Sequence, residues 1–430
     1  MKLQGREIWL PAALLCLAVT ALGQGAPRDV GIVVTDYAEL KVDVMVGALD
    51  VLSGGRDAVA AAELIEEVVR RDLEYSGLIR TEPAPDQADS LHYQFVVEGT
   101  VEGPLRDAEQ TGEVQPTVVS LNLLTWPERQ LIVNKRYRPL PSQFRTSAHH
   151  FSNQVIEFTT GEPGICLTRV AFSRGTGDRR DLYVVDYDGE GLMRLTANRT
   201  LNLCPSWSPD GSEIAFTSYR HGQQGLYSLD TSNGKVRLII AQEGLNLGAD
   251  WHPDGQELVL SLSRGGNPEI YRVAPDGRII RRLTVSKAVE ISPSWAPGGR
   301  ELVFTSDRTG TPQLYIIDEE GAGRRRLSFE GQYNDSAQWS PRGDRIVYTF
   351  RDEGFNRIVL IKPSGEERRI LTDASWGNAE DPCWAPDGRH VVFASDRNGE
   401  SKLYVYDVDE DSFRQLTFGD DPDITPAWSR

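Results

Sequence analysis

The sequence is poor in the residues that carry most covalent and metal chemistry. It contains four cysteines, six histidines and three methionines in 430 residues. Once Cys16 is removed with a predicted leader, Cys166, Cys204 and Cys383 remain, and their spacing matches neither a disulfide scaffold nor a metal site. We expect these three to be small core residues. The motifs G-x-S-x-G and H-E-x-x-H and a phosphate-binding glycine loop are also missing, which disfavours the enzymes that use them.

Positive charge is scarce relative to negative charge. The 46 lysines and arginines face 63 aspartates and glutamates, which leaves a formal net charge of −17. Such a surface repels phosphate backbones, so we expect no nucleic-acid binding. Solubility is the simplest interpretation of the charge, and a basic or neutral protein partner is the alternative.

A long apolar run occurs only near the start of the sequence. Lys2 and Arg6 precede an apolar stretch over residues 8–22, and Ala21 and Gly23 fit a cleavage site. This pattern predicts a Sec-type signal peptide over residues 1–23 rather than a membrane span. No later segment is apolar enough to cross a bilayer. We therefore expect a soluble, exported monomer without direct membrane insertion.

A repeat of about 44 residues, marked by tryptophan, fills the C-terminal part of the sequence. The repeat tryptophans are Trp207, Trp251, Trp295, Trp339, Trp384 and Trp428. Five of them precede a proline–glycine turn (SPDG, HPDG, APGG, SPRG, APDG), and three β-rich runs follow each turn. Four short strands in every 40–50 residues are the signature of a β-propeller blade.

Incomplete units at the two ends of this region complement one another. RVAFSR, DLYVVDYDG and LMRLT, between residues 169 and 196, supply the second to fourth strands of a blade without its first strand. ITPAWSR, at residues 424–430, supplies a first strand alone. We predict that the two pair in one blade, because closing the ring removes its free sheet edges. The ring then has six blades.

Residues 24–161 lack the repeat and predict a small α/β domain. Strands are expected near residues 30–37, 41–49, 92–103, 116–125 and 129–139, and helices at 56–77 and 142–161. An apolar stripe on the first helix, which we interpret as core, comprises Val59, Ala62, Ile65, Val69 and Leu73. The predicted fold is thus an α/β N-terminal domain (24–161) followed by an all-β six-bladed propeller with four-stranded blades (162–430).

The two rims of the predicted ring differ in their sequences. One, named the turn rim, carries the PDG turns, which we interpret as structural because glycine supplies positive φ and aspartate caps the turn. The other, named the loop rim, carries the segments leading into each Trp strand and the loops between second and third strands. Those loops need not repeat, so we expect function on the loop rim.

Carboxylates and apolar residues gather on the loop rim. The carboxylates are Glu290, Asp335, Glu380, Asp381 and Asp423, and the apolar residues beside them are Leu203, Leu245, Ile291 and Ile424. This mixture suits a partner surface. Carboxylates around an axial channel could also hold a divalent cation such as Ca²⁺, although a solvated acidic rim is the simpler interpretation. No cofactor is required by this reasoning.

The chain resembles the TolB family, the periplasmic component of the Tol–Pal envelope system. The resemblance rests on the domain order, the SPDG-type blades, LYVVDYDG, the helix HHFSNQVIEFTTGEPG and the final PAWS. It implies a non-enzymatic periplasmic adaptor that links TolA of the inner membrane to the outer-membrane lipoprotein Pal. Such an adaptor supports outer-membrane integrity and envelope constriction at cell division, and other outer-membrane proteins could also be partners.

The resemblance also implies which segments meet each partner. It assigns TolA binding to Arg28, Asp29, Val30, Gly31, Ile32, Val33, Val34, Thr35 and Asp36, although the family's DSG is missing just after them. An ordinary sheet strand is the alternative for this segment. The Pal-binding rim comprises Leu245, Asn246, Gly248, Ile291, Ser292, Asn334, Asp335 and Asp381, to which the rim's charge adds Glu290, Glu380 and Asp423.

Two other functions stay open at this point. One is an enzyme, since propellers host lyases and lactonases or gate peptidases. A peptidase would need a catalytic domain of on the order of 200 residues, and a lyase or lactonase would need several histidines at the channel, whereas only His221 is placed on the loop rim. The other is a receptor that binds a small ligand in the propeller channel.

Overall fold

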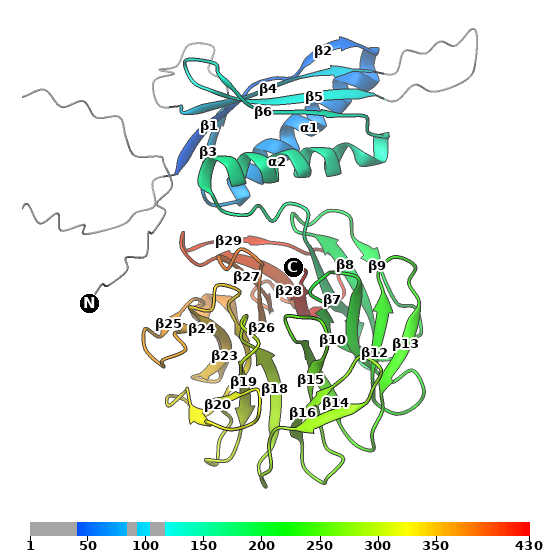
Figure 1. The fold of residues 1–430 in the computed structure, drawn as a ribbon, viewed down its shortest axis with the longest axis vertical. Helices are drawn as coiled ribbons and strands as arrows, with labels where there is room; N and C mark the ends of the chain where they lie inside the picture. Colours follow the sequence, from blue (N-terminus) through cyan, green and yellow to red (C-terminus); the bar gives the residue numbers. More distant parts are fainter. Residues whose placement is uncertain (1–40, 84–92, 104–116) are drawn as a thin grey trace, which may run out of the picture. The chain divides into compact units, whose positions relative to one another are not determined.

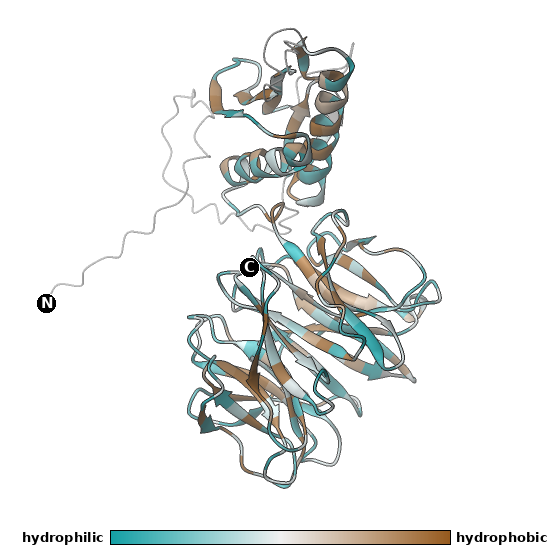
Figure 2. Cartoon of the chain, turned by 90° about the vertical axis from the view of Figure 1, so that its right-hand side faces the viewer, coloured by the Kyte–Doolittle hydropathy of each residue, from teal (hydrophilic) through white to brown (hydrophobic). Residues whose placement is uncertain are grey.

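The computed structural model describes residues 41–83, 93–103 and 117–430, which form an α/β part and a ring of four-stranded sheets (Figure 1). The predicted signal peptide and the predicted TolA-binding segment lie outside the described residues. Coloured by hydropathy, the strands carry much of the apolar sequence and the connecting loops are mostly hydrophilic (Figure 2). None of the described helices is long and apolar enough to span a bilayer.

The α/β part is one mixed sheet with two helices. The sheet has the order β3–β1–β4–β5–β6, and β2 also pairs with β4. Strands β3, β1 and β4 are parallel, whereas β4, β5 and β6 are antiparallel. The elements are β1 Val42–Val46, β2 Asp50–Ser53, α1 Gly55–Tyr75, β3 Ile79–Pro83, β4 Phe95–Glu102, β5 Val118–Thr125, β6 Leu131–Tyr137, the 3₁₀ turn η2 Pro141–Gln143 and α2 Phe144–Thr160.

Helix α1 packs one face into the core of this part. Ala62, Ile65, Val69 and Leu73 are buried, as the apolar stripe predicted. The prediction was wrong for Val59, which is 43% exposed. Successive residues lie about 100° apart around a helix, so Val59 is rotated toward solvent while its neighbour Ala58 faces the core.

The six sheets of the ring are antiparallel blades. In chain order they are blade 1 (β10 Asn202–Trp207, β11 Glu213–Ser218, β12 Gly225–Asp230, β13 Val236–Ile240), blade 2 (β14 Asn246–Trp251, β15 Leu258–Leu262, β16 Glu269–Val273, β17 Ile279–Arg282), blade 3 (β18 Glu290–Trp295, β19 Glu301–Ser306, β20 Gln313–Asp318, β21 Arg325–Arg326), blade 4 (β22 Asn334–Trp339, β23 Ile346–Asp352, β24 Phe355–Ile361, β25 Arg369–Ile370), blade 5 (β26 Ala379–Trp384, β27 His390–Ser395, β28 Lys402–Asp407, β29 Ser412–Gln415) and blade 6 (β30 Asp423–Trp428, β7 Arg169–Thr176, β8 Arg179–Asp186, β9 Met193–Arg194). The first strand named in each blade ends at a repeat tryptophan.

Blade 6 joins the two ends of the ring, as predicted. Strand β30 pairs antiparallel with β7, and Trp428 lies opposite Val170. Two side-chain hydrogen bonds connect residues 260 positions apart: the Arg169 N–H donates to Ser429 Oγ at 2.9 Å, and the Trp428 indole donates to Thr168 Oγ1 at 2.8 Å. The final residues of the chain therefore supply the inner strand of a blade that begins near residue 169.

Each inner strand contains a bulge at the same place. Its pairing register shifts once in every blade, as between Leu203 and Ser206. One residue of each bulge has a φ of 50–65°, in the left-handed region: Cys204, Gly248, Ser292, Ser336, Asp381 and Thr425. A non-glycine residue pays about 1–3 kcal/mol for that conformation. Because all six blades share the bulge, we interpret it as part of the ring architecture.

The α/β part contacts the turn rim through a buried polar network. The carboxylate of Asp188, in the hairpin after β8, is fully buried and accepts hydrogen bonds from Arg71 and Arg145, both at 2.7 Å. Asp72 of α1 is paired with His149 of α2 at 2.8 Å and accepts a bond from the Tyr187 hydroxyl. These contacts fall on the turn rim, at the end of the ring opposite the loop rim.

We expect deletion of residues 424–430 to unfold the propeller, because it removes the inner strand of blade 6 and reopens the ring. Loss of the cooperative thermal transition, followed by circular dichroism, would show this. Deletion of the exposed Arg430 alone is the matched control and should leave the transition unchanged. A seven-residue deletion variant that melts like the full chain would contradict the closure.

Candidate functional site

An axial cavity of about 430 Å³ runs between the six inner strands. Every blade contributes the bulge residue and the two residues after it, and five of the six blades also contribute the tryptophan. The cavity wall is therefore built from the same short segment six times, and its chemistry varies only where the side chains of these segments differ. The differing side chains include Cys204, Asp250, Gln338, Asp381 and Cys383.

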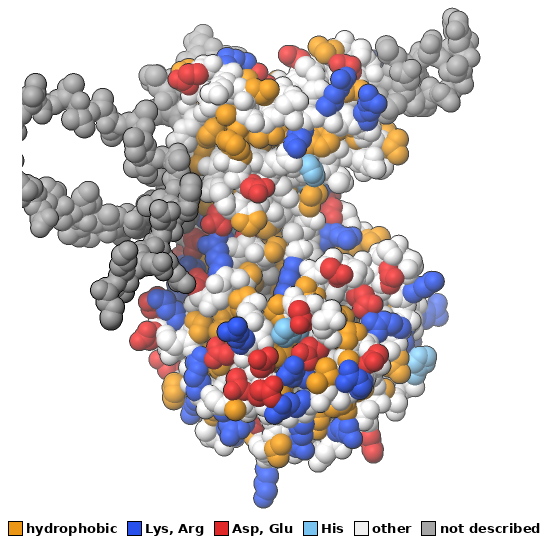
Figure 3. Space-filling view, viewed as in Figure 1, with side chains coloured by type: hydrophobic (Ala, Val, Ile, Leu, Met, Phe, Trp, Pro, Cys, Tyr) orange, Lys and Arg blue, Asp and Glu red, His pale blue; other side chains and the backbone are white. Residues whose placement is uncertain are grey.

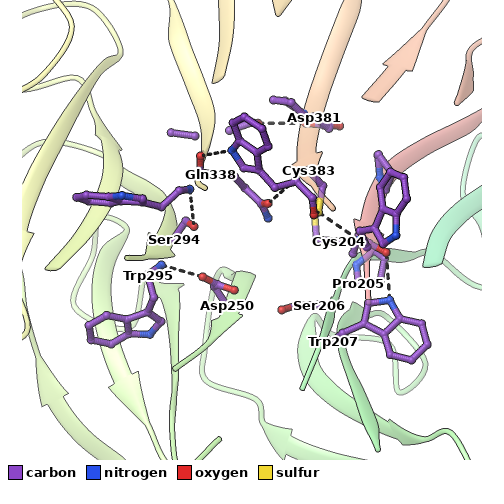
Figure 4. A pocket seen from close by; sticks show the side chains of 18 of the residues that line it. Cys204, Pro205, Ser206, Trp207, Asp250, Ser294, Trp295, Gln338, Asp381 and Cys383 are labelled. Atoms are coloured by element: carbon purple, nitrogen blue, oxygen red, sulfur yellow. Dashed lines mark hydrogen bonds between the residues drawn. The ribbon is translucent and has the colours of Figure 1, made fainter. Parts of the chain in front are cut away.

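Hydrogen bonds across the seams between neighbouring blades use many of these side chains (Figure 4). At four of the six seams, the side chain of the residue before one tryptophan accepts a bond from the backbone N–H of the next tryptophan around the ring. Asp250 accepts from Trp295 at 2.8 Å, and Cys383 Sγ accepts from Trp428 at 3.2 Å. Ser294 and Gln338 do the same for Trp339 and Trp384. We infer that these polar side chains hold the ring together.

The three described cysteines are free thiols, and two of them line the cavity. Burial, followed by the charges of Asp381 and Asp335, raises the pKa of Cys204 to about 12. Burial also raises the pKa of Cys383 to about 12 and that of Cys166 well above its usual value. These thiols stay protonated at neutral pH and are therefore poor nucleophiles. Cys166 and Cys383 are buried, as expected for core residues, whereas Cys204 is half-buried in the cavity wall.

Four residues of the predicted Pal-binding rim are fully buried inside the blades. Asn246, Glu290, Asn334 and Asp423 each begin an inner strand and have no exposed surface. Glu290 is paired with Arg308 at 2.6 Å, and Asp423 with Arg174 at 2.6 Å. Asn246 and Asn334 bond Gln224 and Gln313 of the preceding blade, whereas both arginines belong to the same blade as their carboxylate. The structure therefore offers a partner no access to these four residues.

The remaining predicted rim residues are nearer to solvent or to the cavity. Gly248, Ser292 and Asp381 line the cavity as bulge residues, and Leu245 and Ile291 are half-buried. Asp335 is 9% exposed, and Glu380 is half-buried. Asp335 and Glu380–Asp381 lie in the first three residues of the inner strands of the adjacent blades 4 and 5. We call these three carboxylates the acidic mouth.

Each carboxylate of the acidic mouth accepts a hydrogen bond from a neutral donor. The Tyr333 hydroxyl donates to Asp335 Oδ2 at 3.0 Å, and the Asn356 amide donates to Glu380 Oε1 at 2.5 Å. Ser336 Oγ donates to Asp381 Oδ1 at 3.1 Å. Among the described residues, none of the three carboxylates forms an ion pair, in contrast to Glu290 and Asp423.

Asp381 titrates far from the usual range of an aspartate. Burial, then the negative charge of Glu380, and also that of Asp335, raise the pKa of Asp381 to about 6, while the bond from Ser336 works in the opposite direction. The charge of the acidic mouth therefore changes within a mildly acidic pH range. Burial and Asp335 also raise the pKa of Tyr333, so its hydroxyl remains a donor.

Large exposed apolar side chains on the loop rim were not anticipated from the sequence. Val285, Phe329 and Phe418 are 63–75% exposed, and each lies between an outer strand and the next inner strand. Phe355, at the tip of the β23–β24 hairpin, is 44% exposed. The signal that could have revealed the first three is the apolar residue directly after the repeated L-T or L-S pair. On the face drawn in Figure 3, apolar and charged side chains are mixed.

The described residues contain one group of three side chains with metal-ligand atoms within 4.8 Å of one another, namely Asp72, His149 and Asp188. Arg71, Arg145 and Tyr187 already donate to its carboxylates, so we interpret it as the polar network between the α/β part and blade 6. No three carboxylates of the described loop rim are that close. A cation in the channel stays a prediction.

Replacing Asp381 with asparagine should stabilise the protein at neutral pH. The pKa of Asp381 is about 6 in the folded protein and 3.8 in the unfolded chain, so folding favours the protonated carboxyl. The protonated Asp381 contributes its full stability below pH 3.8, and this stability is lost as pH rises through about 6. Asparagine has no proton to lose and avoids that loss. The difference of about two pKa units corresponds to on the order of 3 kcal/mol. We expect a higher Tm for the variant at about pH 7.5 and a difference that disappears toward about pH 4.

The exposed Glu128→Gln is the matched control and should show no such pH-dependent gap. A lower Tm of Asp381→Asn than of the wild type at neutral pH would contradict the assignment.

Comparisons with known proteins identify the propeller. Residues 156–380, just over half of the chain, match the family model described as the TolB β-propeller domain. The chain is 34% identical over 193 residues to the Tol-Pal system protein TolB of Polaromonas sp., covering 43% of this chain and 45% of the relative. It is 30% identical over 244 residues to TolB of Desulfosudis oleivorans, covering 50% and 51% of the two chains. These matches span about half the length of the relatives.

A solved structure supports the fold over a longer region. The crystal structure of TolB from Acinetobacter baumannii superimposes with a TM-score of 0.76, covering 91% of this chain and 97% of that chain, at 24% identity. At that identity the likeness concerns the fold alone. The match of the family model, together with the six closed blades, shows that the chain belongs to the TolB β-propeller family.

Proposed function

We propose that this protein is a periplasmic adaptor of the Tol–Pal system that binds the lipoprotein Pal at its loop rim and TolA through residues 28–36. The observation that carries the proposal is the asymmetry of the ring. The turn rim is bound by the α/β part, whereas the loop rim combines three unpaired carboxylates with exposed apolar side chains. Apolar anchors around a charged centre are typical of a protein-binding surface.

Family membership supports an adaptor rather than an enzyme. The relatives that match are named as Tol–Pal components, and the described thiols of the channel stay protonated. In this role the protein would connect the inner and outer membranes and support envelope integrity and constriction at division. The acidic mouth and the apolar residues replace the larger rim predicted from the sequence, because Asn246, Glu290, Asn334 and Asp423 are buried.

A small-ligand receptor is the second candidate, favoured by the axial cavity. Its volume of about 430 Å³ falls within the range of small-molecule pockets, and tryptophans from five of the six blades line it. The seam hydrogen bonds engage several of its polar side chains, which leaves fewer groups to select a ligand. We therefore favour the adaptor.

Lysine at both Asp335 and Glu380 should weaken Pal binding without unfolding the ring, because it reverses the charge of the acidic mouth. We expect an increase in Kd of about tenfold or more, measured by calorimetry with purified Pal. The matched control is Glu67→Lys with Glu128→Lys, which makes the same charge change on exposed residues of the α/β part. Unchanged affinity in a folded mouth variant would rule out this surface.

Deletion of residues 24–36 should abolish TolA binding and leave Pal binding intact, because the two partners are assigned to different segments. A pull-down of TolA and Pal with the mature chain and with the truncated chain separates the two assignments. Retention of TolA by the truncated chain would show that TolA contacts another surface.

A further inference from the structure

The acidic mouth carries charge that the rest of the described protein leaves uncompensated. Other buried carboxylates near the loop rim have a cationic partner, as Glu269 has Arg282, Glu290 has Arg308 and Asp423 has Arg174. Asp335, Glu380 and Asp381 accept bonds from neutral groups only, and the charges that act most strongly on Asp381 are the two other carboxylates. Three like charges in adjacent blades favour the arrival of a cation.

An unpartnered oxygen within the mouth points to a hydrogen-bond donor as the ligand. Asp335 is only 9% exposed, and its Oδ1 has no hydrogen-bond partner. Its chain neighbour Ser336 lines the cavity and donates a hydrogen bond to Asp381 of the next blade, which lines the cavity as well, so Asp335 lies at the channel mouth. A buried carboxylate oxygen without a donor is costly, and a ligand that supplies an N–H removes that cost.

The spacing of the carboxylates distinguishes a metal ion from an organic cation. Ca²⁺ gathers its oxygen ligands at about 2.3–2.6 Å from one point, so those oxygens lie close together. The three carboxylates of the mouth do not bring one oxygen each within 4.8 Å of the others. A guanidinium is planar and wider, and its five N–H donors can bond carboxylates on different sides.

We propose that Asp335, Glu380 and Asp381 receive the guanidinium of an arginine side chain that the partner protein presents to the loop rim. The identity of that partner rests on the function proposed above, whereas the chemistry of the mouth does not. Phe355 on blade 4 and Phe329, in the segment that connects blades 3 and 4, are exposed apolar side chains on the same rim. A buried arginine surrounded by apolar contacts is a common energetic centre of protein interfaces.

Binding of the arginine should be coupled to the protonation of Asp381. The titratable groups around this carboxylate are Glu380, Asp335, Cys204 and Tyr333, and its hydrogen-bond donors are the hydroxyl of Ser336 and the backbone N–H of Thr425. A guanidinium stabilises the ionised carboxylate, so arginine binding competes with the proton. Affinity should therefore fall as pH is lowered through the range in which Asp381 titrates.

The test uses the mature full-length chain and two capped tripeptides, Gly-Arg-Gly and its counterpart with citrulline, which has the same shape without the charge. NMR titration should show binding of the arginine peptide and at least about tenfold weaker binding of the citrulline peptide. Asp335→Asn should weaken arginine-peptide binding about tenfold, and the exposed Glu128→Gln should not change it. Affinity should also decrease from about pH 7.5 to about pH 5.5.

Equal binding of the two peptides, or full binding by a folded Asp335→Asn variant, would overturn the proposal. Binding of CaCl₂ alone that excludes the arginine peptide would overturn it as well, since the mouth would then be a metal site. Calorimetry with Pal separates this inference from the proposed function. Pal binding that is insensitive to Asp335→Asn and to pH rejects the arginine site only, whereas arginine-peptide binding without Pal binding supports the site and rejects Pal as the partner.

Discussion

The pairing of β30 with β7 is the interaction on which the rest of the structure depends. A single blade cannot bury both of its faces, so each blade is stable only between two neighbours. Strand β30 gives blade 6 its inner strand and thereby lets blades 5 and 1 both pack against it. The bonds from Trp428 to Thr168 and from Arg169 to Ser429 fix the position of that strand.

The closed ring explains why so many polar residues of the channel are structural. Six inner strands converge around the axis, and their backbone groups must find partners across the seams. Asp250, Ser294, Gln338 and Cys383 supply acceptors for the N–H groups of the following tryptophans. A polar side chain at one of these positions therefore already accepts a hydrogen bond from the neighbouring blade, which limits its capacity to bind a ligand.

The two rims of the ring differ in the contacts that their carboxylates make. On the turn rim, Asp188 and its two arginines connect blade 6 to helices α1 and α2. On the loop rim, the two carboxylates that begin an inner strand are each bound by an arginine of the same blade, Glu290 by Arg308 and Asp423 by Arg174. Asp335, Glu380 and Asp381 lack such a cation, and this difference separates a candidate binding site from structural ion pairs.

The sequence by itself determined the blade number, the shared blade and the α/β part, because these follow from periodicity and turn residues that act locally along the chain. It also placed Asp335, Glu380 and Asp381 on the loop rim, where the structure has them. Only the tertiary structure decided that Glu290 and Asp423 are buried and paired, and that Phe329 and Phe418 are exposed. Whether a side chain is free depends on residues that fold next to it from other strands, and a repeat pattern carries no information about those neighbours.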